Sequence, residues 1–326
     1  MKAQNSLLIL LFLVSLASCR PDDPSATSPD PVSEALTLET PTGTLYGTLL
    51  RPAAEGTFPV ALIIAGSGPT DRNGNSPLGV SSNSLRMLAD SLARYGIASL
   101  RYDKRGVAAS QAAGPSESEL RFDDYVADAA AWVNQLQQDE RLARVAVLGH
   151  SEGSLIGMLA AQQAPVAAFV SLAGVARPAD SLIMEQLREQ PAAIREEAQA
   201  IFTELRQGRT VATVSPALQS LFRPSVQPYL ISWIQYNPSA IIAELQTPVL
   251  IVQGTTDVQV PEAEAQRLAA AQPQAELLII DGMNHVLKPA PAERTANLAT
   301  YSDPTLPLAD SLAPATVKFL ERYLLR

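Results

Sequence analysis

The chain has 326 residues, 47% of them hydrophobic, and a formal net charge of -9 at pH 7. This length and apolar content predict one main domain with a large core rather than several independent domains. The negative charge argues against a nucleic-acid partner, because surfaces that bind nucleic acid need clustered Lys and Arg.

The first residues predict an export signal. Lys2 precedes an apolar run, residues 7–14, that is too short to span a bilayer. The following Leu-Ala-Ser-Cys resembles the bacterial lipoprotein box, and the resemblance implies cleavage before Cys19 and attachment of lipid to its thiol. The alternative is an ordinary secretory peptide in which the Cys is accidental. Cys19 is the only cysteine, which excludes an intrachain disulfide and a catalytic cysteine in the mature fold.

We therefore divide the chain into a lipoprotein signal peptide, residues 1–18, a disordered tether, residues 19–34, and a folded domain, residues 35–326. The tether is rich in Pro, Asp and Ser and has nothing to bury. We expect an exported protein that meets a bacterial membrane only through a lipid anchor at Cys19, on a periplasm-facing or outer surface.

Short apolar runs alternate with helical patterns along the folded domain. Two alternating stretches near its start predict an antiparallel edge. Further strands are predicted at residues 59–65, 97–102, 145–150, 166–172, 248–252 and 275–280, and helices at 85–92, 122–136, 154–163, 263–271 and 309–325. This order predicts an α/β fold with a mostly parallel, doubly wound sheet and functional groups at the strands' carboxyl ends.

The alternation stops between residues 177 and 245. Apolar residues there recur at helical spacing, and four prolines follow. We predict a helical cap over the active end of the sheet. The aromatic residues of this stretch predict a buried or substrate-facing surface, and they are Phe222, Tyr229, Trp233 and Tyr236.

The sequence Gly149-His150-Ser151-Glu152-Gly153 ends one apolar run and precedes a helical pattern. A serine on a sharp strand-to-helix turn needs small residues two positions before and after it, because the backbone there is strained and crowded. Its hydroxyl then stands at the helix N-terminus, aimed outward. We therefore predict that Ser151 is a nucleophile.

A serine nucleophile needs a base, and the base needs an acid to orient it. The chain has two histidines; His150 is adjacent to Ser151 and directed away from it, which leaves His285. Asp257 follows a predicted strand and is our acid. Asp281 is the competitor, but a bracing role in the His285 loop is favoured for it.

Two backbone amides should stabilise the developing oxyanion. We assign the amide of Glu152 as one and that of Ser67 as the other, with Gly68 as the fallback. For the Glu152 side chain we expect helix capping or contact with His150. We interpret Asp71, Arg72 and residues 103–106 as local ion pairs that pin loops.

Four motifs in this order resemble those of α/β-hydrolases, and more narrowly of bacterial carboxylesterases of the serine-aminopeptidase-like group. They are Gly-Ser-Gly-Pro-Thr-Asp-Arg-Asn-Gly at 66–74, Arg-Tyr-Asp-Lys-Arg-Gly at 101–106, Gly-His-Ser-Glu-Gly at 149–153 and Gly-Thr-Thr-Asp at 254–257. The resemblance implies nucleophile Ser151, base His285 and acid Asp257.

We therefore expect a serine hydrolase that cleaves small to medium carboxylic esters. Aminopeptidase or thioesterase activity, or a non-catalytic binding protein of the same fold, are the alternatives. An aminopeptidase needs carboxylates for the substrate amine, and the candidates are Glu185, Glu189, Glu196, Glu197 and Glu204. Two histidines and no clustered cysteines give no zinc site, so no metal or organic cofactor is expected.

Overall fold

The computed structural model describes residues 30–325. The predicted signal peptide, the lipidation site Cys19 and most of the tether lie outside the described residues. The expected end of the tether is wrong, because strand β1 begins at Val32 and so includes residues 32–34. Glu34 has cationic partners in the folded sheet, Arg51 on the neighbouring strand and Arg141 at 2.9 Å.

Eight of the described strands form one sheet in the order β1-β2-β6-β3-β7-β8-β9-β10. Their bounds are Val32–Thr40 (β1), Gly43–Arg51 (β2), Phe58–Ile64 (β3), Ala98–Tyr102 (β6), Leu142–His150 (β7), Ala168–Leu172 (β8), Val249–Gly254 (β9) and Glu276–Ile280 (β10). Strand β2 pairs antiparallel with both β1 and β6, and the other pairs are parallel. The predicted mostly parallel sheet with an antiparallel N-terminal edge is confirmed.

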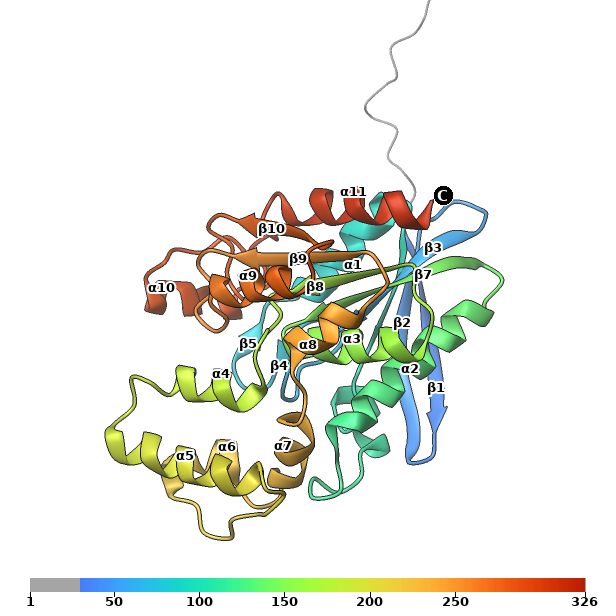
Figure 1. Ribbon diagram of the computed structural model, residues 1–326. Helices are drawn as coiled ribbons and strands as arrows, with labels where there is room; N and C mark the ends of the chain where they lie inside the picture. The colour runs from blue at the N-terminus through green and yellow to red at the C-terminus, as the bar shows by residue number, and fades with distance from the viewer. Residues whose placement is uncertain (1–29, 326) are drawn as a thin grey trace, which may run out of the picture.

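Helices cover both faces of this sheet (Figure 1). One face carries α1 (Ser84–Arg94) and α11 (Leu312–Leu324), whose apolar residues share one buried cluster with β3, β7 and β8. The other face carries α2 (Phe122–Gln138), α3 (Glu152–Gln163), α8 (Pro238–Glu244) and α9 (Glu262–Ala271). The predicted alternation of strand and helix therefore gives a sheet buried on both sides.

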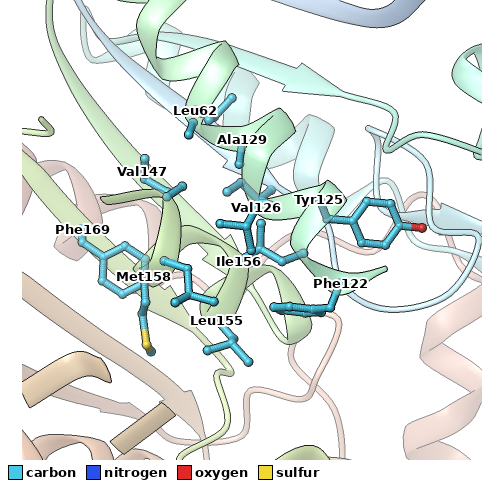
Figure 2. Packing of buried hydrophobic residues seen from close by; sticks show 14 of the residues in the cluster. Leu62, Phe122, Tyr125, Val126, Ala129, Val147, Leu155, Ile156, Met158 and Phe169 are labelled. Atoms are coloured by element: carbon cyan, nitrogen blue, oxygen red, sulfur yellow. The ribbon is translucent and has the colours of Figure 1, made fainter. Parts of the chain in front are cut away.

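Helix α3 lies at the centre of the second face. Its residues Leu155, Ile156 and Met158 pack with Val126 of α2 and Phe169 of β8, as Figure 2 shows. Each large apolar side chain buried in this way contributes about 1.5–3 kcal/mol to folding. The first turn of α3, which follows Ser151, is therefore held by the hydrophobic core.

The segment between β8 and β9 contains helices and no sheet strand. Before α8 it forms α4 (Ala179–Gln186), α5 (Ala192–Leu205), η2 (Pro216–Leu218), α6 (Gln219–Phe222) and α7 (Gln227–Trp233), which lie together below the sheet in Figure 1. Its aromatic residues are mostly buried: Phe222 meets Phe202 edge-on at 4.9 Å between ring centroids, and Trp233 stacks on Phe122 of α2 at 6.0 Å. Aromatic packing thus attaches this segment to α2.

The remaining elements are short. A two-stranded antiparallel hairpin, β4 (Asn75–Ser76) and β5 (Val80–Ser81), lies between β3 and α1, and η1 (Ala108–Ala113), α10 (Arg294–Ala299) and η3 (Thr300–Ser302) lie in loops. Over residues 30–325, the helices all fall short of the length and apolar character that crossing a membrane would require.

Candidate active site

Ser151 occupies a strained turn between β7 and α3. Its φ is 55° and its ψ is -120°, a region that a residue with a side chain adopts only when the surrounding structure enforces it. A Cβ atom on Gly149 would lie 2.2 Å from the carbonyl oxygen of Gly153, and one on Gly153 would lie 2.4 Å from that of Ile64. Both positions therefore need glycine, as the sequence pattern predicts.

Asp257 and His285 meet at the carboxyl ends of β9 and β10. His285 Nδ1 lies 2.8 Å from Asp257 Oδ2. The other carboxylate oxygen, Oδ1, accepts hydrogen bonds from the amides of Gln259 at 2.8 Å and Val260 at 2.9 Å. Burial alone would raise the pKa of Asp257, but the charge that His285 carries when protonated and these hydrogen bonds hold it below its ordinary value.

Gly254 allows the two loops to come together. A Cβ atom there would lie 1.9 Å from the carbonyl oxygen of Met283, so any side chain would force the His285 loop away from β9. The competing acid, Asp281, is exposed and accepts a hydrogen bond from Thr255 Oγ1 at 3.0 Å. The structure brings Asp257, and not Asp281, against the imidazole.

His150 is buried, lines the same cavity as Ser151 and lies beside His285. The two imidazole rings are 4.9 Å apart between centroids, and His150 Nε2 lies 2.8 Å from the backbone carbonyl oxygen of His285. A carbonyl only accepts, so we assign the proton to Nε2. Burial lowers the pKa of His150 to about 4, which keeps the ring neutral near pH 7.

Ser151 and His285 line the same cavity, which has a volume of about 220 Å³. The rest of the wall comes from the loop after β3, the β4–β5 hairpin and the segments that follow β9 and β10. It includes Ser67, Leu78, Val80, Gln259, Val286 and Tyr301. Gln259 Nε2 donates to the Tyr301 hydroxyl at 3.2 Å across this wall. Among the described residues, those that line the cavity include no Asp or Glu.

Residues 177–245, which we predicted to form a helical cap over the active end of the sheet, do form helices, but these residues, all of which the structure describes, contribute nothing to the lining of this cavity. The segment between β3 and α1, residues 66–84, occupies that position instead. The insertion reaches a neighbouring cavity of about 340 Å³ through Arg223, Val226 and Tyr229, on the other side of Gly68 and Pro69.

The two predicted oxyanion donors flank the serine. Glu152 is the first residue of α3, and Ser67 lies in the cavity wall directly after β3. Neither amide donates to a protein acceptor within residues 30–325. A Cβ atom on Gly66 would lie 3.2 Å from Ser151 Cβ, whereas one on Gly68 would have no atom within 4 Å. The peptide unit between Gly66 and Ser67 is therefore the one that abuts the serine.

The charged loop residues form pairs that join distant segments rather than local ones. Arg72 pairs with Asp103 at 2.7 Å, and Arg105 with Asp128 of α2. Asp71 instead accepts from the amides of its own turn.

The expectation for the Glu152 side chain is also wrong. Its carboxylate contacts neither the helix amides nor His150, but Lys104 at 2.8 Å and the Tyr229 hydroxyl at 2.6 Å. The carboxylate turns away from the helix because a buried ammonium group is available to it.

Known proteins resemble this chain in sequence and in structure. Residues 78–226 match the family described as serine aminopeptidase, S33. Esterase EstD of Thermotoga maritima is 25% identical over 257 residues, which are 74% of this chain and 58% of that esterase, so the chain spans less than two thirds of that relative.

Two solved structures superpose over 90% of this chain and 100% of their own, each with a TM-score of 0.61. They are the α/β hydrolase GrgF from Penicillium sp., which is 19% identical, and Est1E from Butyrivibrio proteoclasticus with bound ferulic acid, which is 18% identical. This chain has the α/β-hydrolase fold.

Within this α/β-hydrolase fold, two residues near the serine were not predicted as part of the site. Lys104 and Tyr229 both contact Glu152 and lie 125 positions apart in the chain. The only sequence signal for Lys104 is a run of three charged residues, 103–105, directly after a buried strand. Tyr229 carries no signal beyond its place in an aromatic-rich stretch.

Proposed function

We propose that this α/β hydrolase is a serine carboxylesterase that cleaves small to medium carboxylic esters. The observation that carries the proposal is the 2.8 Å contact between Asp257 and His285 in the wall of the cavity that also holds Ser151. A serine at a strained strand-to-helix turn, an imidazole and a carboxylate are the groups that acyl transfer requires.

In the proposed reaction, the imidazole of His285 takes the proton of Ser151 as the hydroxyl oxygen attacks the ester carbonyl. Asp257 holds Nδ1 of the ring in its protonated form, so Nε2 can accept that proton. The amides of Ser67 and Glu152 stabilise the oxyanion. The alcohol leaves with the proton from His285, and water then cleaves the acyl-enzyme with His285 as base.

The cavity favours an ester over an aminoacyl substrate. A substrate amine needs a carboxylate, and the residues that line the cavity, all in the described part of the chain, include none. The five candidate glutamates lie in the insertion instead, where Glu185 pairs with Arg177, Glu204 pairs with Arg209 and Glu197 accepts from the amide of Ser215. The name of the relative EstD, an esterase, supports the same substrate class.

The test compares p-nitrophenyl esters of increasing acyl length with aminoacyl p-nitroanilides and acyl thioesters. We expect the short and medium esters to be cleaved fastest. A fluorophosphonate probe should label wild-type protein and should not label Ser151→Ala. Absence of an adduct in the wild type would favour a non-catalytic binding protein. Faster cleavage of anilides would indicate an aminopeptidase instead of an esterase, and faster cleavage of thioesters a thioesterase.

We also propose that the protein is exported and held at a membrane by lipid on Cys19. This proposal rests on the Leu-Ala-Ser-Cys sequence at residues 16–19. In a bacterial host, radiolabelled palmitate should enter the wild type and not Cys19→Ala, and only the wild type should sediment with membranes. Release of unlabelled wild type into the soluble fraction would contradict it.

A further inference from the structure

Lys104, Glu152 and Tyr229 form a buried chain of polar contacts next to the proposed triad. Lys104 Nζ lies 2.8 Å from Glu152 Oε2, and the Tyr229 hydroxyl donates to Glu152 Oε1 at 2.6 Å. Their exposed fractions are 0%, 4% and 8%. The three residues come from the loop after β6, the first turn of α3 and helix α7 of the insertion.

Lys104 has a second acceptor. Its Nζ donates to the backbone carbonyl oxygen of Gly66 at 2.6 Å, and it lies 4.8 Å from the ring centroid of Tyr125. The ammonium group therefore contacts one carboxylate, one main-chain carbonyl and one aromatic face. Each of these partners is within the protein, so the position of the ammonium group is fixed on several sides.

The Gly66 carbonyl belongs to the same peptide unit as the Ser67 amide. In a trans peptide unit the C=O and N–H bonds point in opposite directions, so a group that holds the oxygen also sets the direction of the N–H. The described residues contain no cis peptide bond. A cation on the oxygen also polarises the unit and makes its N–H a stronger donor.

The partner of Lys104 carries the other oxyanion donor. Glu152 contributes its backbone amide to the proposed oxyanion hole, and its carboxylate is held by Lys104. Lys104 thus links the two residues whose amides would bind the oxyanion, through its ion pair with Glu152 and its hydrogen bond to the carbonyl oxygen of Gly66. Tyr229 extends this link to the insertion.

We propose that Lys104 is a positioning residue of the oxyanion hole, which aligns the Ser67 amide through Gly66 and the Glu152 amide through its carboxylate. Tyr229 connects helix α7 to Lys104 through the carboxylate of Glu152. The inference rests on the proposed serine hydrolase function. Stability alone is a weak reason to bury such a pair, because well-packed apolar residues of similar volume often serve as well or better.

The chain offers a matched control. Arg105, the residue after Lys104, forms a comparably buried pair with Asp128, and neither residue touches Glu152 or Gly66 in the contacts of the described chain. If burying an ion pair after β6 serves only folding, removal of either pair should affect the enzyme in the same way.

The experiment measures kcat and KM with a short p-nitrophenyl ester, and the inhibition constant of a trifluoromethyl ketone, which forms an oxyanion on the serine. The variants are Lys104→Met, the double variant Lys104→Met with Glu152→Gln, and the control pair Arg105→Met with Asp128→Asn. The double variant leaves no unpaired buried charge, so it remains informative if Lys104→Met folds poorly. Fluorophosphonate titration corrects each rate for the fraction of competent enzyme.

Loss of one oxyanion donor costs about 10²–10³ in kcat, so misalignment should cost about 10–100-fold. We expect this fall in kcat in both Lys104 variants with KM within about threefold, and a rise of the ketone inhibition constant by the same factor. Tyr229→Phe, which removes only the hydroxyl, should lower kcat about 2–5-fold. The control pair should change neither constant by more than about twofold.

Failure of this inference is distinguishable from failure of the proposed function. If the probe labels wild-type Ser151 but the Lys104 variants keep kcat and the inhibition constant within twofold, only the inference is overturned. It is also overturned if KM rises while kcat holds, or if the control pair loses as much. If the probe does not label the wild type, the serine hydrolase proposal itself is wrong.

Discussion

The side chain of His150 donates a 2.8 Å hydrogen bond to the backbone carbonyl of His285, and so connects the turn that carries Ser151 to the loop that carries the proposed base. The two loops follow different strands, β7 and β10, which are not neighbours in the sheet. This hydrogen bond is therefore a direct link between them at the active end. Because His150 is buried and neutral, the link has a pH dependence of its own.

Acid should weaken the fold through His150. In the unfolded chain this ring takes up a proton below its ordinary pKa of 6.5, whereas burial in the folded state delays protonation to about pH 4. The unfolded state therefore binds more protons between these values, and the free energy of unfolding should fall by roughly 3 kcal/mol as pH falls from 6.5 to 4. Urea unfolding at several pH values measures this.

His150→Gln is the control for that measurement, since a glutamine amide can donate to the same carbonyl without titrating. We expect its free energy of unfolding to fall less steeply between pH 6.5 and 4. Equal slopes for wild type and variant would show that His150 does not carry the acid sensitivity.

Removing the carboxylate partner of His285 should affect catalysis far more than folding. Asp257→Asn leaves a side chain of the same shape but does not hold the protonated Nδ1 tautomer, so kcat should fall by roughly 10³–10⁴-fold. Asp281→Asn should keep kcat within about twofold, because its contact is with Thr255. Steady-state kinetics with one ester distinguishes the two carboxylates. A larger loss of kcat in Asp281→Asn than in Asp257→Asn would reverse the assignment of the acid.

Gly254→Ala should both destabilise the protein and lower its activity. The added Cβ would meet the Met283 carbonyl oxygen at 1.9 Å, so the main chain that leads to His285 must move. A displacement of about 1 Å can cost about 10²-fold in rate. Gly208→Ala is the comparison: its φ is +73° but its Cβ meets nothing within 4 Å, so only strain of about 1 kcal/mol is expected. Unchanged kcat in Gly254→Ala would contradict the steric argument.

The two ion pairs that flank the neighbouring cavity should differ in their effect on stability. Asp128→Asn leaves the buried Arg105 without its anion and should cost about 3–5 kcal/mol of unfolding free energy. Burial raises the pKa of Asp128 although Arg105 opposes the shift. Glu117→Gln removes the exposed partner of Arg223 and should cost less than about 1 kcal/mol. Thermal or urea unfolding of Asp128→Asn and Glu117→Gln measures this difference in unfolding free energy.

Much of the fold was predictable because its signals are local. Continuous apolar runs marked the buried parallel strands, and the glycines around Ser151 marked a turn that admits no side chain. The strand-end positions of Asp257 and His285 then followed from the geometry of a parallel sheet. Each of these inferences needs only neighbouring residues and a general rule.

The parts that were missed depend on contacts between distant residues. The sequence around Lys104 does not indicate that its partner, Glu152, lies 48 positions later in the first turn of α3. The β4–β5 hairpin has strands of two residues each, too short for an alternation pattern. This hairpin borders the cavity, whereas no residue of the fully described insertion lines it, so the pocket wall could not be predicted from the sequence. The start of β1 was missed because its polar residues find partners only in the folded sheet.

The insertion between β8 and β9, described over its whole length, contributes no residue to the lining of the Ser151 cavity, and it reaches Glu152, next to the serine, through the hydroxyl of Tyr229. The domain is thereby modular: an engineer could exchange α4 to α6 for an unrelated helical segment while the sheet keeps the reacting groups in register. Such a graft should keep α7, because Tyr229 on that helix donates to Glu152. Chain replacement at this place should therefore leave the lining of the Ser151 cavity unchanged.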